Sequence, residues 1–410
     1  MSWNFIRADQ FCSFITDGTH SSPKSLKTGR KLITSKHLKE YYLDLENANC
    51  ISEADYNKII ARSQVEQWDI LFSMIGTIGN IYLEKSPKVE YACKNVGIFK
   101  FAGNRDDAYW MYYYLKSPQA KIYIKTHLRG STQAYMTLSG LREMPIAIPE
   151  KNVRQQIISI LRPIDERIEI NNMINDNLLE QTKNLFKNWF VNNPDATSWK
   201  KGSLSKFIEQ MISGDWGKDS PSGNNTEMVY CIRGTDIPDI RIGNKGKMPT
   251  RYILPKNYTA KHLVNGDIVV EISGGSPTQS TGRATVISTA LLERYDKRMV
   301  CTNFCKAIKP KTGYSMYVYH YWQYLYDMGI FFSYENGTTG IKNLDINSFI
   351  ETEPILIAPA KIIEKFDAFC QAVFSQVYAN GLENDQLTLV RNTLLPKLMT
   401  GEIDVSKLSI

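Results

Sequence analysis

The stretch NVRQQIISILRPIDERIEINNMINDNLLEQTKNLFKNWF, residues 152–190, has the pattern of one long amphipathic helix. Its apolar side chains recur at steps of three, four or seven, with polar Asn171 keeping the register, so they share one narrow face. These apolar positions are Ile157, Ile160, Ile164, Ile168, Ile174, Leu178 and Leu185. A helix of this length spans about 55 Å, which is more than the core of one compact domain needs. The narrow face therefore predicts a partner that runs along the helix.

The best candidate for this partner lies near the other end of the chain. There a second series of side chains keeps the same heptad spacing as far as Pro396, where a helix is expected to end. Its members are Ile363, Phe366, Cys370, Val373, Val377, Asn384, Leu387 and Leu394. The two long helices are thus expected to pair lengthwise. The alternative is two unrelated surface helices that belong to two separate domains.

Length and charge restrict the class of protein. With 410 residues the chain is long enough for two domains or more, each with its own core. A net charge of +7 and a pI near 8.8 suit a polyanionic partner. No apolar run approaches the length of a membrane span, and the start MSWNFIRAD lacks the charged and then apolar layout of a signal peptide. We therefore expect a cytoplasmic protein with no membrane partner.

Similar segments follow one another in the same order in the two halves of the chain, at a separation of about 200 residues. The matched segments are 11–18 with 207–214, 32–38 with 231–237, 68–80 with 266–283, 93–101 with 301–310, 108–117 with 317–327, 129–133 with 336–340, and 144–149 with 353–359. In each half a strand that begins after an Asp ends in a Gly-rich loop, and an aromatic helix follows further on. The chain is therefore expected to be globule, helix, globule, helix.

The predicted fold class is α+β, with two similar globules of mixed strands and short helices. The globules are expected at residues 1–150 and 193–358, each followed by a long helix, at 151–192 and at 359–410 together with the C-terminal tail. The junction VNNPDATSWKKG, residues 191–202, is rich in Asn, Pro and Gly and is the expected hinge.

No motif of a known catalytic site is present in the sequence. It contains no Walker A loop, no GxGxxG after a strand, no HExxH and no GxSxG. The Asn/Asp-Pro-Pro-aromatic box with which an amino-methyltransferase holds its target base is also missing. We therefore predict no catalytic residue in this chain.

The cysteines and histidines do not form metal-binding patterns. Seven cysteines are scattered without a CxxC, so neither a disulfide framework nor a zinc site is indicated, and Cys301 with Cys305 are expected to point into the core. The five histidines are dispersed without metal spacing and are expected at surface or turn positions: His20, His37, His127, His262 and His320. No metal ligand is predicted.

Positive charge recurs in the same region of both halves. Residues 21–39 and 241–261 each contain six cations and no acid, and residues 121–142 form a third stretch without an acid. A run of this kind is often only a solvated face. Here it recurs beside turns rich in Gly, Ser, Thr, Asn and Gln, and these residue types with Lys and Arg are the ones that contact phosphates and base edges. Double-stranded DNA is the expected partner.

Two Gly-rich loops, SMIGTIGN at 73–80 and SGGSPTQSTGR at 273–283, lack the lysine and the spacing of a nucleotide-binding loop and are expected to approach DNA instead. The Tyr and Trp residues of 109–114 and 319–326 have helical spacing, so they are expected in the core rather than stacked on bases. The predicted DNA-contacting residues are Lys24, Lys27, Arg30, Lys36, Thr77, Asn80, Arg129, Ser131, Thr132, Gln133, Arg233, Lys245, Lys247, Ser276, Thr278, Gln279, Arg283, Asn336, Thr338 and Thr339.

Nearly the whole chain resembles a specificity subunit of a type I restriction-modification system. The most specific similarity is IAIPEKNVRQQIISILRPIDERIEINNMINDNLLEQTKNLFKNWFV, with LVRNTLLPKLMTGEI at 389–403 and ITDGTHSSPK at 15–24 in support. One departure is the second helix, which begins PAKIIEKFDAF without a counterpart of Gln155 and Gln156 and contains Gly381 midway. The start and straightness of that helix are therefore open.

The resemblance implies a non-catalytic DNA-binding adaptor. Two target-recognition domains would each read one half of a bipartite, asymmetric DNA site, and the long helices would pair as an antiparallel coiled coil that fixes the gap. Since the two globules differ in nearly every polar loop, they are expected to read different sequences. The chain would hold two methyltransferase subunits, which bring S-adenosylmethionine, and through them restriction subunits that use ATP and Mg²⁺. No cofactor is expected in this chain itself.

Two points stay open. The apolar helix end formed by Leu185, Phe186, Trp189 and Phe190 suits either docking of the methyltransferase or packing against the second helix or globule. A DNA-binding scaffold, or a cryptic nuclease with carboxylates around Asp267 and Glu271, is the alternative outside a type I system. Glu271 is expected to hold a loop in place.

Overall fold

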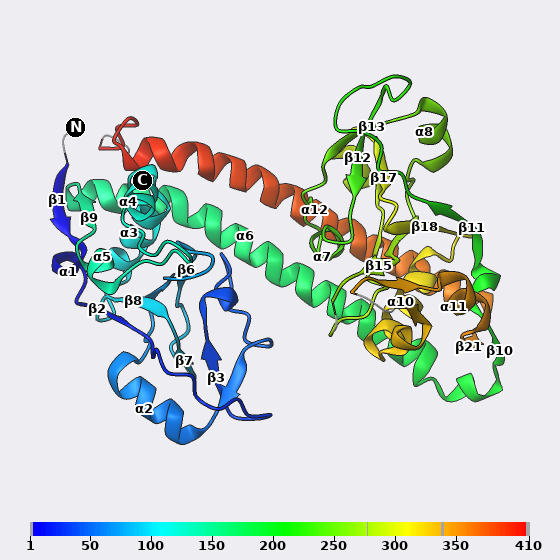
Figure 1. Cartoon of the computed structure of the whole chain (residues 1–410), viewed down its shortest axis with the longest axis horizontal. Helices are drawn as coiled ribbons and strands as arrows, with labels where there is room; N and C mark the ends of the chain where they lie inside the picture. Colours follow the sequence, from blue (N-terminus) through cyan, green and yellow to red (C-terminus); the bar gives the residue numbers. More distant parts are fainter. Residues whose placement is uncertain (1–2, 277, 338–339, 407–410) are drawn as a thin grey trace. The chain divides into compact units, whose positions relative to one another are not determined.

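The computed structural model describes residues 3–276, 278–337 and 340–406. The chain forms two compact units (Figure 1). Unit 1 consists of Met1–Glu169 with Leu387–Ile410, and unit 2 of Ile170–Gln386. Each unit has its own hydrophobic core, which includes the fully buried Trp110 in unit 1 and Trp322 in unit 2. The predicted α+β class is confirmed, with both long helices passing from one unit to the other.

Unit 1 contains three small sheets. A four-stranded antiparallel sheet has the order β2-β8-β5-β6, a three-stranded sheet has the order β4-β3-β7 with β3 and β7 parallel, and β1 pairs with β9. The strands are β1 (Asn4–Arg7), β2 (Phe14–Asp17), β3 (Arg30–Ile33), β4 (Asn49–Ile51), β5 (Ile70–Ser73), β6 (Ile81–Leu83), β7 (Tyr91–Cys93), β8 (Val96–Lys100) and β9 (Pro145–Ile148). The helices of the globular part are α1 (Ala8–Phe11), the 3₁₀ helix η1 (Ser35–His37), α2 (Glu53–Ser63), α3 (Arg105–Lys116), α4 (Pro118–Thr126) and α5 (Leu138–Arg142).

Unit 2 repeats this topology strand by strand. Its sheets have the orders β11-β18-β14-β16, β13-β12-β17 with β12 and β17 parallel, and β10-β21. The strands are β10 (Lys200–Gly202), β11 (Ile208–Ser213), β12 (Glu227–Ile232), β13 (Thr250–Ile253), β14 (Ile268–Glu271), β16 (Ala284–Val286), β17 (Met299–Cys301), β18 (Cys305–Pro310) and β21 (Ile355–Ile357), and a further small sheet joins β15 (Ser273–Gly274), β20 (Lys342–Leu344) and β19 (Glu335–Asn336). The helices are η3 (Pro194–Ser198), η4 (Leu204–Phe207), α7 (Ile237–Arg241), α8 (Pro255–Lys261), α9 (Thr289–Glu293), α10 (Ser315–Asp327), η5 (Ile330–Tyr334) and α11 (Ile346–Thr352). The same strand order in both units confirms the predicted internal repeat.

The aromatic helices α3 and α10 lie in the cores, as their helical spacing predicts. Trp110 and Trp322 are fully buried. Each indole donates a hydrogen bond to a backbone carbonyl, Trp110 to Ala147 at 3.0 Å and Trp322 to Gly282 at 2.7 Å. Because the rings are enclosed and their N–H groups are satisfied, they are not available to stack on bases.

The long helices are α6 (Lys151–Phe186), which ends in a π-helical turn over Lys187–Val191, and α12 (Ala360–Met399). The predicted end of the second helix at Pro396 is wrong by three residues, since α12 continues to Met399. A proline inside a helix removes one hydrogen bond. Here the last turn is held by Leu398 and Met399, which are each 1% exposed in the core of unit 1. The predicted domain boundaries at 150/151 and 358/359 lie beside the first residues of these two helices.

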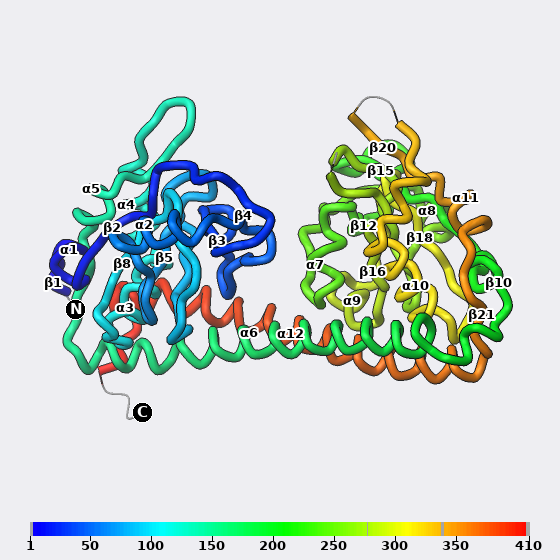
Figure 2. Tube along the Cα trace, turned by 90° about the horizontal axis from the view of Figure 1, so that it is seen from below, coloured from blue at the N-terminus to red at the C-terminus, as the bar shows by residue number. Residues whose placement is uncertain are grey.

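Within each unit the two long helices run antiparallel, side by side (Figures 1 and 2). In unit 2 the Nδ2 of Asn171 donates to Asn384 Oδ1 at 2.9 Å, and Asn380 Nδ2 donates to Asn175 Oδ1 at 2.8 Å. Later residues of α6 thus pair with earlier residues of α12, so the two helices run in opposite directions. The predicted lengthwise pairing of the helices is confirmed in unit 2 and, through Asp165 and Arg391, in unit 1.

The seven cysteines are free and buried, including Cys301 and Cys305. The expectation that every histidine lies at a surface or turn position is wrong for His320, which is 5% exposed inside α10, whereas His37 is 2% exposed but lies in the short 3₁₀ turn η1. His320 lies among Phe186, Phe366 and Phe374, and its Nδ1 is 2.8 Å from the carbonyl oxygen of Met316. Burial lowers the pKa of His320 to about 4. This ring is part of the core.

Candidate nucleic-acid interface

In unit 1 the structure brings together two of the loops that the sequence assigns to DNA. Loop 73–80 follows β5 and closes on itself through a hydrogen bond from Ser73 N to Asn80 O at 2.8 Å. Loop 129–135 is closed by two 2.9 Å backbone hydrogen bonds between Arg129 and Tyr135. The two loops join where Met136 N donates to Met74 O at 2.8 Å. In Figure 2 loop 129–135 projects from the body of unit 1.

The predicted contact residues of these two loops are all exposed. They are Thr77, Asn80, Arg129, Ser131, Thr132 and Gln133. Lys36 is exposed on the adjacent η1, and the next residue but one, Leu38, accepts a hydrogen bond from Asn80 Nδ2 at 3.4 Å. Lys24 and Lys27 are exposed on the segment before β3. The predicted contact residues of both loops, with Lys24, Lys27 and Lys36, are therefore polar or basic and open to solvent.

Arg30 differs from the other predicted cations of unit 1. Its Nε lies 2.9 Å from Glu53 Oε2 and its Nη1 lies 3.0 Å from Glu90 Oε1, and the guanidinium covers the ring of Tyr56. The hydrogen bonds to Glu53 and Glu90 raise the pKa of Arg30. The guanidinium thus ties the end of α2 to the sheet. This pairing argues against the predicted DNA contact at Arg30, because Glu53 and Glu90 compete with a phosphate for the guanidinium.

Unit 2 places the equivalent loops side by side in the same way. The small sheet β15-β20-β19 pairs Ser273 with Asn343 and Gly274 with Lys342, so the start of loop 273–283 lies against residues 342–344 and, through them, 335–336. Thr278, Gln279 and Asn336 are exposed and Ser276 is half-buried. The predicted contacts Thr338 and Thr339 lie outside the described residues.

Arg283 closes the base of loop 273–283. Its Nε donates to Glu271 Oε2 at 2.8 Å and its Nη2 donates to Glu271 Oε1 at 2.6 Å, and the two residues also form a backbone hydrogen bond of 2.8 Å. The hydrogen bond with Glu271 raises the pKa of Arg283. A Cβ at Gly234 would lie 2.4 Å from Glu271 Oε1, so the carboxylate is enclosed. Glu271 holds the loop, as the sequence suggests, and the same fork argues against Arg283 as a direct base contact.

Arg233 is likewise paired with an acid. Its Nε and Nη2 donate to the two carboxylate oxygens of Asp236 at 2.9 and 3.1 Å, and Nη2 also donates to Lys247 O at 2.7 Å. Burial opposes ionisation of Asp236, but the hydrogen bonds from Arg233 and from backbone N–H groups hold its pKa below the usual value. Arg233 therefore shapes the turn, whereas Lys245 and Lys247 are exposed beside it.

The carboxylates that the nuclease alternative invoked have structural partners. Asp267 Oδ2 lies 3.0 Å from Lys309 Nζ and accepts Val264 N at 2.9 Å, and the equivalent Asp69 in unit 1 lies 2.8 Å from Lys100 Nζ. Burial raises the pKa of both aspartates. Among residues 3–276, 278–337 and 340–406, no three His, Cys, Asp or Glu side chains are grouped so that they could hold a metal ion. The two carboxylates that this alternative named, Asp267 and Glu271, are thus each paired with a cation within the fold.

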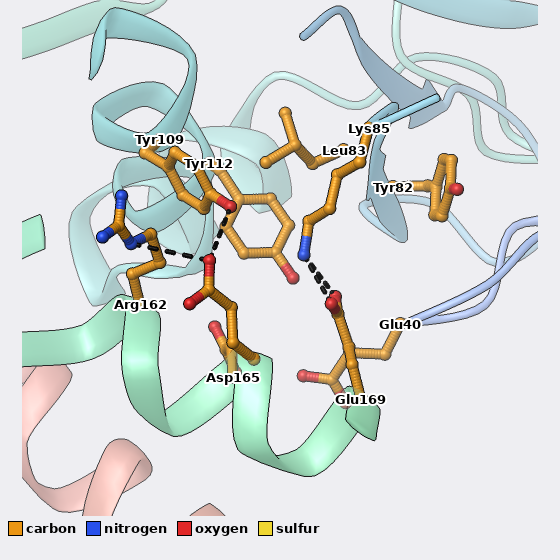
Figure 3. Close-up of a pocket in the computed structure, with 10 residues that line it drawn as sticks. Glu40, Tyr82, Leu83, Lys85, Tyr109, Tyr112, Arg162, Asp165 and Glu169 are labelled. Atoms are coloured by element: carbon orange, nitrogen blue, oxygen red, sulfur yellow. Dashed lines mark hydrogen bonds and ion pairs between the residues drawn. The ribbon is translucent and has the colours of Figure 1, made fainter. Parts of the chain in front are cut away.

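A small cavity of unit 1 lies between α6, α3 and β6 (Figure 3). Lys85 reaches Glu169 there, with an Nζ–Oε1 distance of 2.7 Å. The cavity residues are Glu40, Tyr82, Leu83, Lys85, Tyr109, Tyr112, Arg162, Asp165, Glu166 and Glu169. Its volume is about 10 Å³, which is about the least that admits one water molecule.

The four predicted docking residues divide into two pairs. Phe186 and Phe190 are 1% exposed, with ring centroids 5.8 and 5.1 Å from that of Phe366 on α12. The predicted docking of the methyltransferase is wrong for Phe186 and Phe190, because both rings are buried in the core between the second helix and the second globule. Leu185 and Trp189 are half-buried.

The exposed apolar residues of α6 lie earlier in that helix. Met173 is 65% exposed, Ile170 48% and Ile174 39%. Ile174 belongs to the predicted apolar face, whereas the pattern did not single out Ile170 or Met173.

In the described part of the chain no helix is both long and apolar enough to cross a membrane.

Residues 23–180 match the family described as Type I restriction modification DNA specificity domain. The chain is 25% identical over 327 residues to the MjaIX type I restriction enzyme specificity subunit of Methanocaldococcus jannaschii, an alignment that covers 73% of this chain and 70% of that protein. It is 23% identical over 343 residues to the HindI specificity subunit of Haemophilus influenzae, with 67% and 72% covered. The crystal structure of the type I restriction-modification S subunit from M. genitalium has the same fold, with a TM-score of 0.53, 16% identity, and coverage of 97% of this chain and 96% of that one.

Proposed function

Because the chain belongs to the specificity subunits of type I restriction-modification systems, we propose that each of its two globules reads one half of a bipartite, asymmetric DNA site. The observation that carries this proposal is the repeated pair of polar loops with exposed side chains, 73–80 with 129–135 in unit 1, and 273–276 and 278–283 with 335–337 and 340–344 in unit 2. Loops rich in Thr, Asn, Gln and Ser offer donors and acceptors to base edges, and nearby lysines suit phosphates. The two pairs differ in sequence, so the two half-sites differ.

The predicted contacts divide into two roles under this proposal. Base edges are read by the exposed polar side chains of the paired loops, among them Gln133 and Gln279. Phosphates are contacted by the exposed lysines, among them Lys24, Lys36 and Lys247. Arg30, Arg233 and Arg283 hold the backbone that carries these side chains.

The long helices α6 and α12 set the spacer between the half-sites in this proposal. A helix rises about 1.5 Å per residue and duplex DNA about 3.4 Å per base pair, so a rigid helical pair converts a number of residues into a number of base pairs. Both helices are continuous where the chain passes from unit 1 to unit 2.

The chain has no catalysis of its own in this proposal. It holds two adenine methyltransferase subunits, which supply S-adenosylmethionine, and through them restriction subunits that use ATP and Mg²⁺. Leu185 and Trp189 remain candidate docking residues, and the exposed Ile170, Met173 and Ile174 join them, since apolar side chains on a helix surface favour a covering partner.

The test is genome-wide adenine methylation in cells that carry this chain and its methyltransferase, with and without this chain. A two-part motif with one fixed gap that disappears on deletion is the expected result. An active methyltransferase whose motif does not change on deletion would overturn the proposal. The matched control is a catalytically inactive methyltransferase with the intact chain, which should leave the motif unmethylated.

A further inference from the structure

In unit 1 a buried polar cluster joins three parts of the chain. Asp165 of α6 accepts two hydrogen bonds at Oδ1, from Arg391 Nη1 of α12 at 2.7 Å and from Tyr41 OH of the globule at 3.1 Å. Arg391 also contacts Tyr41 and lies 2.8 Å from Glu40 Oε1. Asp165 and Arg391 are only 3% and 5% exposed. We call this cluster the unit 1 junction.

In unit 2 a different polar cluster joins the same three kinds of element. Asn175 Nδ2 of α6 donates to Val377 O of α12 at 3.1 Å and to Ile242 O of the globule at 3.3 Å. Asn380 Nδ2 of α12 donates back to Asn175 Oδ1 at 2.8 Å. Asn175 and Asn380 are 2% and 5% exposed.

Gly381 explains how the globule approaches the helix there. A Cβ at Gly381 would lie 1.9 Å from Gly243 O, so only glycine admits the loop after α7 at this point of α12. Arg294 of the globule then donates to Gly243 O at 2.9 Å and to Tyr378 O at 2.8 Å. We call these contacts, with Asn175 and Asn380, the unit 2 junction.

Apolar side chains with a heptad spacing can pair again after one helix slides along the other, because one leucine replaces another. Buried polar groups cannot do so. A slide would leave Asp165 or Arg391 buried without its partner, and an unpaired buried charge is strongly destabilising. A buried Asn at a core position of a helix pair likewise specifies one register.

We propose that the two junctions are register locks: Asp165, Arg391 and Tyr41 in unit 1, and Asn175, Asn380 and Gly381 in unit 2, fix where each recognition domain sits along the helix pair. The inference rests on the proposed function, since the consequence for DNA is a single permitted gap between the half-sites. These are positioning residues and touch neither base nor phosphate.

The test uses the full chain with its methyltransferase in cells and measures the gap lengths of all methylated sites. The unit 1 variant is D165L/R391M/Y41F, which replaces the polar lock by apolar groups of similar volume. The expected result is that sites with a gap one base pair shorter or longer gain methylation about tenfold, with unchanged half-site sequences. The matched control is E180A/Q386A, which changes exposed residues of the same two helices and should keep the single gap.

A purely structural role would lower the amount of folded chain and leave the gap unchanged. A unit 1 variant that copurifies with the methyltransferase and keeps the single gap therefore overturns the inference. If that variant does not accumulate, N175A/N380A in unit 2 carries the same test with the same two outcomes. A wild-type chain that directs no two-part motif refutes the proposed function instead, so the two failures are distinguishable.

Discussion

Two of the predicted DNA contacts of loop 273–283, Gln279 and Arg283, should respond to mutation in different ways. Arg283 is held by the buried Glu271 through two hydrogen bonds, whereas Gln279 is exposed. Substituting Ala at Arg283 leaves the Glu271 carboxylate, which is 8% exposed, without its cation. We therefore expect R283A to lower stability and Q279A to change DNA recognition alone.

The magnitudes follow from the burial of each group. Removing one partner of a fully buried ion pair costs about 3–5 kcal/mol, and because the Arg283 side chain is still 21% exposed we expect about 2 kcal/mol. For a unit of this size that corresponds to a fall in Tm of roughly 6 °C. Loss of one bidentate contact between an amide side chain and a base edge costs about 1–3 kcal/mol of discrimination at one base position, and this is the magnitude expected for Q279A.

Thermal unfolding and DNA binding to sites altered in one half at a time separate these effects. Q279A should keep the wild-type Tm and lose discrimination in one half-site only. R283M/E271L should recover part of the stability lost in R283A, because it removes the buried charge together with its partner. An unchanged Tm for R283A would refute the assignment of Arg283 to the loop base, and equal loss at both half-sites for Q279A would refute its role in reading one of them.

Three further outcomes are expected. K24A or K36A should weaken binding to specific and unrelated DNA alike and reduce the slope of log K against log salt by about 0.9 for each lost phosphate contact; an unchanged slope in titrations at several salt concentrations would exclude that contact. A heptad inserted in both α6 and α12 as a matched pair adds about 10.5 Å and should lengthen the methylated spacer by about three base pairs; an unchanged site would exclude the ruler. Burial lowers the pKa of His320 to about 4 in the folded protein, whereas the pKa in the unfolded chain is about 6.5. Between pH 6.5 and 4 the unfolded state therefore binds the proton in preference to the folded state, and the free energy of unfolding should fall by up to about 3 kcal/mol. Urea unfolding of H320F at both pH values should lack this loss, whereas the exposed control H127Q should retain it.

The sequence predicted the candidate interface in part. The exposed polar loops of both units lie where the Gly-rich and polar turns indicated, because a loop that connects two strands is restricted to the surface near their ends. The predicted contact lysines Lys24, Lys27, Lys36, Lys245 and Lys247 are also exposed. The three arginines Arg30, Arg233 and Arg283 are each paired with an acid, and the basic stretches of the sequence do not reveal where these acids lie.

By itself the sequence determined the two long helices, the repeated order of strands and the α+β class, since hydrophobic periodicity and the order of turns are local properties of the chain. Only the tertiary structure decided that Phe186 and Phe190 are core residues and that His320 is buried among aromatic rings. It also decided why α12 carries Gly381, where the backbone of Gly243 leaves no room for a side chain. These features depend on groups that are distant in sequence, and a residue's own neighbours along the chain do not specify what will cover it in space.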